Sequence, residues 1–355
     1  MQRSEEQPVR SHGGSPPPCC HDFSAPFNPL GPPPWLGDVL EECVGRREHL
    51  RYPGHGYEEL REAIALFHGA EPGEVVVSNG AAEALALLPL LLRARRLVVV
   101  EPGFGDHAVQ TPAAGLELAR VAMARDPGGG FVLDAKGLVR MAGEGAVAVL
   151  SRPSNPTGYL APRDLVLDAA RRLAAEGSWL VVDEAFIDLS PGARPLEPGD
   201  GLIVVRSLTK TFASPGLRLG YVYAERRLAR RLDAARQPWP VGGLEACVYA
   251  GLLVDPRSRG YVQRGRRVVE VEAERIRRVV ERMGLRAYPT RAPFILVEHP
   301  QLPHPAMQEK LVAHGVYVRD ASSFYGLGPG YSRVSIRTPG ENDVLLRAME
   351  RALQG

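Results

Sequence analysis

The segment LIVVRSLTKTFASPGLRLGYVYA, residues 202–224, places two continuous apolar runs on either side of a polar stretch. The runs are LIVVRS (202–207) and LGYVYA (219–224). A continuous apolar run, rather than an alternating one, is typical of a strand buried on both faces of a mostly parallel sheet. Between the runs, Lys210 stands between two threonines, and Arg218 follows eight positions later beyond a serine, a proline and a glycine. Taken alone, such a lysine is most simply an exposed side chain, so the rest of the chain decides its role.

The same kind of apolar run recurs upstream, with helical patterns before and between the runs. An amphipathic helix is expected over residues 56–69, and a largely buried helix over residues 81–94. The further apolar runs are LVVVE (97–101), AVAVLS (146–151) and WLVVDE (179–184). This alternation predicts an α/β fold in which helices flank a mostly parallel sheet.

The two ends of the chain have a different pattern. After about residue 255, a long charged helix leads into short strand-like pieces and a last helix, which predicts a smaller α+β domain. The arginines of the long helix are interpreted as a solvated face. The first 35 residues are rich in proline and polar residues and are expected to form an extended arm. We therefore predict an arm or lid at 1–35, a large domain at 36–254 and a small domain at 255–355.

Composition excludes several classes of function. The 355 residues carry a formal net charge of +2, so no global field attracts nucleic acid or a membrane surface. No apolar run approaches the roughly 18 residues that a spanning helix needs, and the N-terminal residues lack the apolar centre of a secretory signal. The four cysteines show neither metal-ligand spacing nor a disulfide framework, so reduced cysteines, no metal site and a cytoplasmic location are expected.

Polar residues stand just past several predicted strands, where ligands bind in open α/β sheets. Three of these motifs carry a resemblance: SNPTG (154–158), DEAF (183–186) and SLTK…GLRLG (207–220). In order and separation they resemble the signature of the fold-type I pyridoxal phosphate (PLP) enzymes, the aspartate aminotransferase superfamily. The resemblance implies a large PLP-binding domain, a smaller domain and PLP as cofactor.

The resemblance assigns roles around the cofactor ring. Lys210 corresponds to the lysine that forms a Schiff base with the cofactor aldehyde and later moves protons at the substrate carbon. A nearby cation such as Arg218 lowers the pKa of such a lysine. Asp183 is expected to pair with the pyridine nitrogen, Asn155 to donate to the phenolic oxygen, and Phe104 to stack on the ring. Without the resemblance, Asp183 would be interpreted as a solvated residue at a strand end, Asn155 as a turn residue and Phe104 as a core residue.

Donors for the cofactor phosphate are expected where SNGAAEAL (78–85) joins a strand to a helix, because a helix N-terminus binds anions. Many relatives have a hydroxyl residue where Ala82 stands, so one side-chain donor is missing. Tyr52, in RYPGHGY, matches a tyrosine that reaches the phosphate of the neighbouring subunit in this superfamily, which implies a homodimer with shared active sites. The expected phosphate-binding residues are Gly80, Ala81, Ala82, Ser207, Thr209, Arg218 and Tyr52.

Longer segments are similar to the threonine-phosphate decarboxylases of cobalamin biosynthesis, which are relatives of the histidinol-phosphate aminotransferases. DFSAPFNPLG (22–31) and DEAFIDL (183–189) separate the two groups best. Phe186 stands where aminotransferases of this branch usually carry a tyrosine, and its absence resembles the decarboxylase. The implied reaction is decarboxylation of L-threonine O-3-phosphate to (R)-1-amino-2-propanol O-2-phosphate.

Charged and arm residues are the candidates for substrate binding. Arg337 matches the superfamily's substrate-anion arginine, while Arg333 and Arg319 are weaker candidates. His12, Gly13 and Asn28 match segments that fold over the substrate phosphate in the decarboxylase, so the arm is expected to act as a lid.

Two departures leave alternatives open. Gly242 follows PWPV where the decarboxylase has asparagine, and His107 replaces a tyrosine, so the substrate can be another phosphorylated or phosphonate-bearing amino acid. A histidinol-phosphate-type aminotransferase is the main alternative. A non-catalytic PLP-binding regulator is a third, disfavoured because it would need an attached DNA-binding domain.

Overall fold

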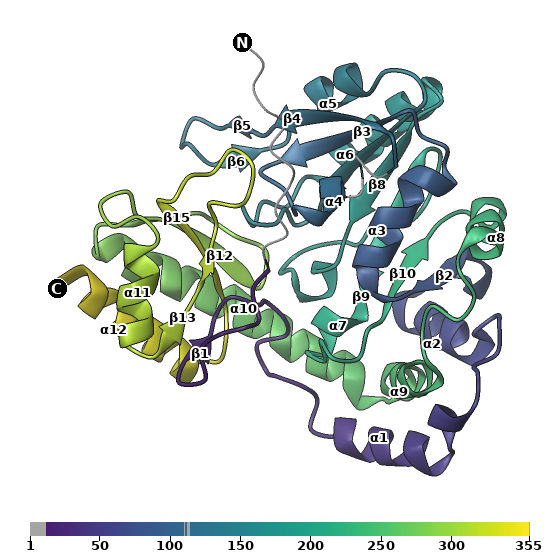
Figure 1. Cartoon of the computed structure of the whole chain (residues 1–355), viewed down its shortest axis with the longest axis horizontal. Helices are drawn as coiled ribbons and strands as arrows, with labels where there is room; N and C mark the ends of the chain where they lie inside the picture. Colours follow the sequence, from purple (N-terminus) through teal and green to yellow (C-terminus); the bar gives the residue numbers. More distant parts are fainter. Residues whose placement is uncertain (1–11, 110, 112–113, 355) are drawn as a thin grey trace.

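The largest feature of the computed structural model, which describes residues 12–354 apart from 110 and 112–113, is a seven-stranded sheet. Its strand order is β2-β10-β9-β8-β7-β3-β4 (Figure 1). All neighbours are parallel except β10, which runs antiparallel to β2 and β9. The strands are β2 (Val75–Ser78), β3 (Arg96–Glu101), β4 (Glu117–Ala122), β7 (Ala146–Ser151), β8 (Trp179–Asp183), β9 (Leu202–Ser207) and β10 (Gly220–Tyr223). The predicted α/β fold with a mostly parallel sheet is confirmed.

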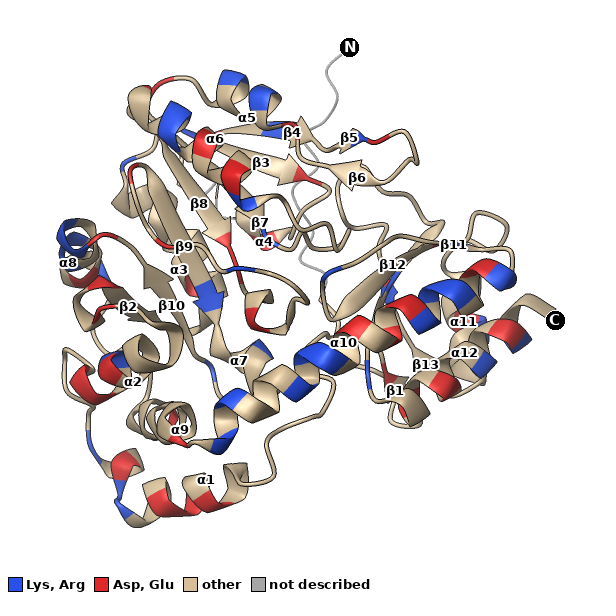
Figure 2. Cartoon of the chain, turned by 180° about the vertical axis from the view of Figure 1, so that it is seen from behind, with Lys and Arg blue, Asp and Glu red and all other residues tan. Residues whose placement is uncertain are grey.

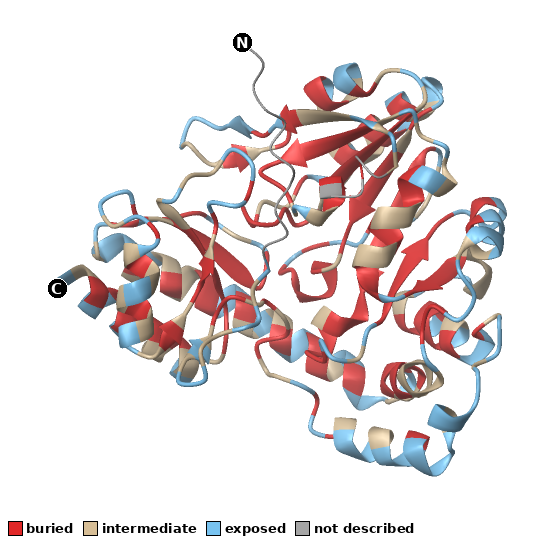
Figure 3. Cartoon of the chain, in the orientation of Figure 1, coloured by how far each residue is buried: buried red, intermediate tan, exposed pale blue. Residues whose placement is uncertain are grey.

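Helices bury both faces of this sheet, which explains why its strands are apolar at successive positions (Figure 3). On β3, Val98 and Val100 belong to one core cluster while Leu97 and Val99 belong to the other. The first cluster includes residues of α1 (Leu36–Gly45), α2 (Glu58–His68), α5 (Ala135–Ala142), α6 (Arg163–Ala175) and α9 (Gly243–Val254). The second includes residues of α3 (Gly80–Leu91), α4 (Asp106–Val109) and α8 (Arg226–Ala235).

Short elements connect these layers at the edges of the sheet. The helix α7 follows β9 directly and carries Lys210. The others are single helical turns and a two-stranded hairpin. The short elements, α7 included, are α7 (Leu208–Thr211), η1 (Glu48–Leu50), η2 (Pro72–Glu74), η3 (Ile187–Leu189), β5 (Ala124–Arg125) and β6 (Phe131–Val132).

A second, four-stranded antiparallel sheet has the order β11-β12-β15-β14 and its own apolar core. The arm adds β1 in parallel to β13 beside this sheet. Whether the chain divides at residues 35 and 254 stays a prediction. The elements are β1 (His21–Asp22), β11 (Arg286–Ala287), β12 (Phe294–Glu298), β13 (Val316–Tyr317), β14 (Arg319–Asp320), β15 (Tyr331–Ser335), α10 (Arg257–Arg282), α11 (Ala306–Ala313) and α12 (Pro339–Gln354).

Helix α10 is the long charged helix that the sequence predicts, and its C-terminal half carries both arginines and glutamates (Figure 2). Arg277 lies 2.9 Å from Glu274 and 2.6 Å from Glu281. Exposed pairs of this kind contribute little to stability, so they fit the interpretation of a solvated face.

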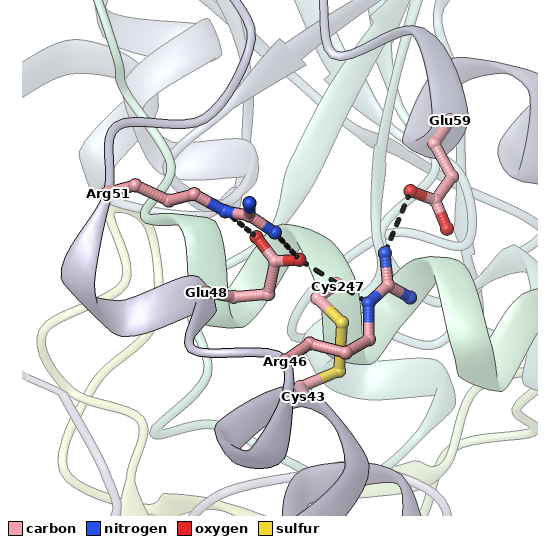
Figure 4. The surroundings of a disulfide bond; sticks show 6 residues. All are labelled: Cys43, Arg46, Glu48, Arg51, Glu59 and Cys247. Carbon is pink, nitrogen blue, oxygen red and sulfur yellow. Dashed lines mark hydrogen bonds and ion pairs between the residues drawn. A yellow bond between two sulfur atoms is a disulfide. The ribbon is translucent and has the colours of Figure 1, made fainter.

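The expectation of four reduced cysteines is wrong. Cys43 of α1 and Cys247 of α9 form a disulfide across a sequence separation of 204 residues (Figure 4). Spacing along the chain could not reveal this bond, because only the packing of α1 on α9 brings the two thiols together. Cys19 and Cys20 are free. Around the disulfide, Glu48 accepts hydrogen bonds from Arg51 on the protein surface (Figure 4).

Within the described ranges, no helix is both long and apolar enough to cross a bilayer. The same ranges contain no group of three or more histidine, cysteine or acidic side chains arranged to hold a metal ion.

Candidate active site

A cavity of about 470 Å³ opens at the carboxyl ends of β8 and β9, the edge where ligands bind in open α/β sheets. The arm, the first turn of α3 and strands β14 and β15 complete its wall. Most of the predicted site residues meet here, together with Phe186 and Arg319. The predicted residues in the lining are His12, Gly13, Ala81, Ala82, Phe104, Asn155, Asp183, Ser207, Thr209, Lys210, Arg218 and Arg333. Gly80, Tyr52, Asn28 and Arg337 lie outside it.

Lys210 is a half-buried lysine in an unusually cationic place. Burial is the main cause that lowers its pKa to about 8, and the charges of Arg333 and Arg218 lower it further. The carboxylate of Asp183 opposes this shift in part. A lysine amine with a lowered pKa is available as a nucleophile near neutral pH. The site therefore suits the lysine to attack on an aldehyde.

Asp183 ends β8 as a buried carboxylate with three polar neighbours. His107 Nε2 and Ser151 Oγ each lie 3.3 Å from Oδ2, and the Ala185 amide donates to Oδ1 at 3.0 Å. The contact with His107 was not predicted, although the sequence showed His107 as a departure near the pocket. The sequence signal for this contact was that His107 stands three positions after Phe104, a predicted cofactor residue. In the structure the two rings lie 5.6 Å apart.

A cradle for a phosphate lies at the N-terminus of α3. Gly80 has φ +70°, and a Cβ there would come within 2.7 Å of Arg218 Nη2, so glycine lets the guanidinium approach the helix start. The hydroxyls of Ser207 and Thr209 are 2.7 Å apart beside it. Backbone amides at a helix N-terminus, an arginine and two hydroxyls fit a phosphate monoester. The residues therefore fit the phosphate of PLP.

Close packing below this cradle depends on a second glycine. A Cβ at Gly220 would lie 2.4 Å from the Ala81 amide nitrogen. Only a residue without a side chain lets β10 run directly beneath the first turn of α3. The turn at 213–216 returns the chain from α7, and Arg218 donates to the Pro215 carbonyl at 3.2 Å.

Two arginines from neighbouring strands face the opposite side of the cavity. Arg333 on β15 pairs in register with Arg319 on β14. Arg333 donates to Asn155 Oδ1 at 2.7 Å and to the Ser24 carbonyl at 2.6 Å, and its buried Nε has no partner among the described residues. Burial first, and then the charge of Arg319, lower the Arg333 pKa to about 9. Two neighbouring cations with little water around them favour an anion.

The structure places Arg337 outside this cavity. Its Nη2 donates to the carbonyls of Asp22 at 2.8 Å and Ala25 at 3.2 Å, and its guanidinium lies 3.9 Å from the centre of the Phe27 ring. It thus holds the arm, and it borders a separate cavity of about 360 Å³. Arg333 and Arg319, the weaker candidates from sequence, are the arginines that reach the site.

Asn28 is also outside the lining. It is fully buried, and its Nδ2 donates to the Thr211 carbonyl at 3.0 Å while its Oδ1 accepts from the Leu30 amide at 3.1 Å. These contacts join the arm to α7 instead of pointing to a substrate.

The start of the described arm lies against the side of the cavity that Phe104 and Asp106 form. His12 Nε2 lies 3.4 Å from Asp106 Oδ2, and its ring is 6.0 Å from that of Phe104. A Cβ on Gly13 would lie 2.4 Å from the Ser24 carbonyl oxygen, so the arm packs on itself at this point. Tyr52 lies elsewhere, 76% exposed and stacked on Trp239 at 4.4 Å.

Comparison with known proteins places this site in a family. The model of the family "Aminotransferase class I and II" matches residues 39–349, so the chain belongs to that family. The threonine-phosphate decarboxylase of Salmonella typhimurium is 32% identical over 94% of this chain and 91% of its own. The histidinol-phosphate aminotransferase of Thermococcus gammatolerans is 30% identical over 90% of this chain and 88% of its own.

Solved structures share the fold. The L-threonine-O-3-phosphate decarboxylase of Porphyromonas gingivalis aligns with a TM-score of 0.81 and 22% identity, covering 94% of this chain and 99% of its own. The histidinol-phosphate aminotransferase of Sinorhizobium meliloti in complex with pyridoxal-5'-phosphate aligns with a TM-score of 0.79 and 23% identity, covering 94% and 90%. The predicted class is thus confirmed: this is a PLP-dependent enzyme of the aminotransferase class I and II family.

Proposed function

We propose that the protein decarboxylates L-threonine O-3-phosphate to (R)-1-amino-2-propanol O-2-phosphate, the amino-alcohol phosphate of cobalamin biosynthesis. The observation that carries the proposal is the pair Arg333 and Arg319, which faces the lysine across one cavity. A phosphorylated amino acid brings a carboxylate and a phosphate, and the cradle at α3 already suits the cofactor phosphate. Two further arginines provide for the additional anionic charge of such a substrate. The similarity to the Salmonella typhimurium decarboxylase supports the same reaction.

The residues present determine where the cofactor would be held. Lys210, Asp183, Arg218, Ser207 and Thr209 are the groups that fit it. When bound, PLP supplies an electron sink for the pair released when the bond from Cα to the carboxylate breaks. The lysine Nζ, with its lowered pKa, can then deliver a proton to the same carbon.

The choice of reaction would depend on how the residues of the cavity orient the bonds to the substrate Cα. Arg333 and Arg319 would hold the anionic groups of the substrate on one side. The arm borders the site through His12 and Gly13, and it would help to exclude water from a bound substrate. Phe186, whose ring packs at 5.2 Å on Phe294, brings no hydroxyl to the cavity.

A histidinol-phosphate-type aminotransferase is the second candidate, supported by the Thermococcus gammatolerans relative. The cofactor groups serve either reaction. A decarboxylase for a related phosphorylated or phosphonate-bearing amino acid is a variant of the first proposal, since the same arginine pair would bind its anion.

One experiment separates these activities. The PLP-loaded protein is incubated with L-threonine O-3-phosphate, with and without 2-oxoglutarate, while CO2 and glutamate are measured. We expect CO2 release that needs no keto acid. Glutamate formed from histidinol phosphate and 2-oxoglutarate, without CO2 from the phosphothreonine, would overturn the proposal. Lys210→Ala should abolish either activity.

A homodimer in the cytoplasm completes the proposal. Tyr52 is 76% exposed and stacks on Trp239, and this exposed aromatic pair supports a second copy covering it. Analytical ultracentrifugation would test this, and Tyr52→Ala should weaken PLP binding if Tyr52 reaches the partner's phosphate site. The disulfide argues against a reducing cytoplasm, because such bonds persist mainly in oxidising compartments, so thiol titration of the protein as isolated from cells tests this part of the proposal.

A further inference from the structure

Lys210 is carried by a helix that cannot fix its own position. Helix α7 has four residues, so it contains barely one turn and little internal hydrogen bonding. Where the lysine amine points therefore depends on the contacts that hold α7 from outside. Two such contacts come from different parts of the chain.

The first contact comes from the arm. The Asn28 backbone amide donates to the Lys210 carbonyl at 3.0 Å, and its side-chain Nδ2 donates to the Thr211 carbonyl at 3.0 Å. One residue thus binds the last two carbonyls of α7. These oxygens belong to the end of a helix, where few intrahelical donors remain.

The second contact comes from the segment after β8. Thr211 Oγ1 donates to Asp188 Oδ2 at 2.8 Å, and Thr211 is buried. The Asp188 carbonyl accepts two hydrogen bonds from Arg266 of α10, at 3.1 and 2.9 Å. Helix α7 is therefore clamped between the arm on one side and the region of Asp188 on the other.

The fit of Asn28 against α10 is tight. A Cβ added at Gly265 would lie 2.3 Å from Asn28 Oδ1, closer than such atoms approach. Glycine in the middle of a helix is unfavourable by itself, so its place here is explained by the asparagine side chain that occupies the space. With Oδ1 also accepting from the Leu30 amide, the Asn28 side chain has one available orientation.

We propose that Asn28 is a positioning residue for Lys210, and that the arm packs on α7 and the lysine amine takes its position at the same time. The arm then does more than cover the substrate, because it completes the support of the cofactor lysine. The inference rests on the assignment of Lys210 as the residue that bonds the cofactor. It replaces the substrate-binding role that the sequence suggested for Asn28.

The test uses cofactor-free protein and follows PLP capture by absorbance as a function of pH. In the wild type, the rate should rise with a midpoint near the Lys210 pKa of about 8. Asn28→Leu keeps a similar side-chain shape and adds no charge, but it removes the Nδ2 donor to the Thr211 carbonyl. We expect capture at least about tenfold slower, since a displaced reacting group loses rate steeply. The midpoint should also move to higher pH, because a loosened lysine is better solvated.

Gly265→Ala gives the same perturbation from α10, since the added Cβ displaces Asn28 without touching α7, and it should shift the midpoint in the same direction. The matched control is Tyr261→Phe, which removes the hydrogen bond from Tyr261 to the Gly31 carbonyl of the arm. That variant should keep the wild-type midpoint. The charged groups around the amine are Arg333, Arg218, Asp183 and Arg337, and none of them changes in any variant.

The outcomes distinguish the two claims. An unchanged midpoint in Asn28→Leu and Gly265→Ala would overturn the inference, whatever their melting temperatures, and would leave the proposed function intact. PLP capture by Lys210→Ala would instead overturn the assignment of the lysine. If both test variants fail to fold, hydrogen exchange on the wild type decides. Capture of PLP should slow exchange at the Asn28 amide because the coupling is reciprocal, and no change there would overturn the inference.

Discussion

Replacing Arg333 with methionine is expected to remove substrate binding while leaving Lys210, Asp183 and the phosphate cradle at α3 in place. The guanidinium is buried, holds Asn155 and the Ser24 carbonyl, and faces the cavity beside Arg319. Methionine has a similar length and no charge, so the change deletes the fork of donors and leaves most of the packing.

The size of the effect follows from the hydrogen bonds at stake. A guanidinium fork offers an anion two charge-assisted hydrogen bonds, each contributing about 1.5–3 kcal/mol. Their loss amounts to about 3–6 kcal/mol, which corresponds to a decrease of about 10²–10⁴-fold in kcat/KM. The Lys210 pKa should rise in the same variant, because Arg333 is a neighbouring cation that lowers it.

The assay is CO2 release from L-threonine O-3-phosphate over a range of concentrations, with Arg337→Met as the comparison. Arg337 holds the arm from outside the cavity, so its replacement should lower thermal stability and change kcat/KM by no more than about tenfold. A kcat/KM for Arg333→Met within tenfold of wild type, together with a large loss in Arg337→Met, would refute this reasoning. The substrate anion would then lie on the arm side of β15.

Three further outcomes are expected. Gly80→Ala should weaken PLP binding by about tenfold or more, because the added Cβ meets Arg218. The control is Gly69→Ala, since Gly69 has the same φ of +70° and an added Cβ there would meet nothing within 4 Å. Equal PLP dissociation constants for the two variants would contradict the prediction. Lys210→Met should stabilise the cofactor-free protein at pH 7 by up to about 3 kcal/mol. The wild-type lysine has its folded pKa lowered to about 8, so this advantage is full below pH 8 and fades as the pH rises toward 10.5, which urea unfolding at pH 7 and 10 would check. Reducing the disulfide should lower the free energy of unfolding by about 2–5 kcal/mol. Thiol titration of the denatured protein should find two thiols before reduction and four after it. Four thiols before reduction would exclude the bond.

Much of the fold could be predicted because burial leaves a direct trace in residue type. The runs 97–101, 146–151, 179–184 and 202–207 all became strands of the large sheet, each apolar at successive positions because helices cover both faces. The run 219–224 also became a strand, but the pattern could not reveal that β10 runs antiparallel. Direction depends on how the turn after α7 folds back, and apolar residues alone do not record it.

The candidate site, like the fold, could be predicted only in part from the sequence. Residues that follow strand ends, such as Asp183, Asn155 and Lys210, meet in the cavity because parallel strands end at one edge of a sheet. Arg333 and Arg337 are four positions apart on one short segment, and their spacing could not say which one faces the cavity. Strand β15 ends at Ser335, so only Arg333 lies within its alternation and pairs with Arg319.

Local pattern and motif order therefore determined the fold class, the cofactor and the lysine, because each is written in a contiguous stretch of chain. Besides the direction of β10 and the choice between the two arginines, tertiary structure decided the disulfide between α1 and α9, the contact of His107 with Asp183, and the packing of Asn28 between α7 and Gly265. Each of these joins residues that are far apart in sequence. Such contacts exist only once the helices and strands have packed, since the chain carries no local signal of which distant groups will meet.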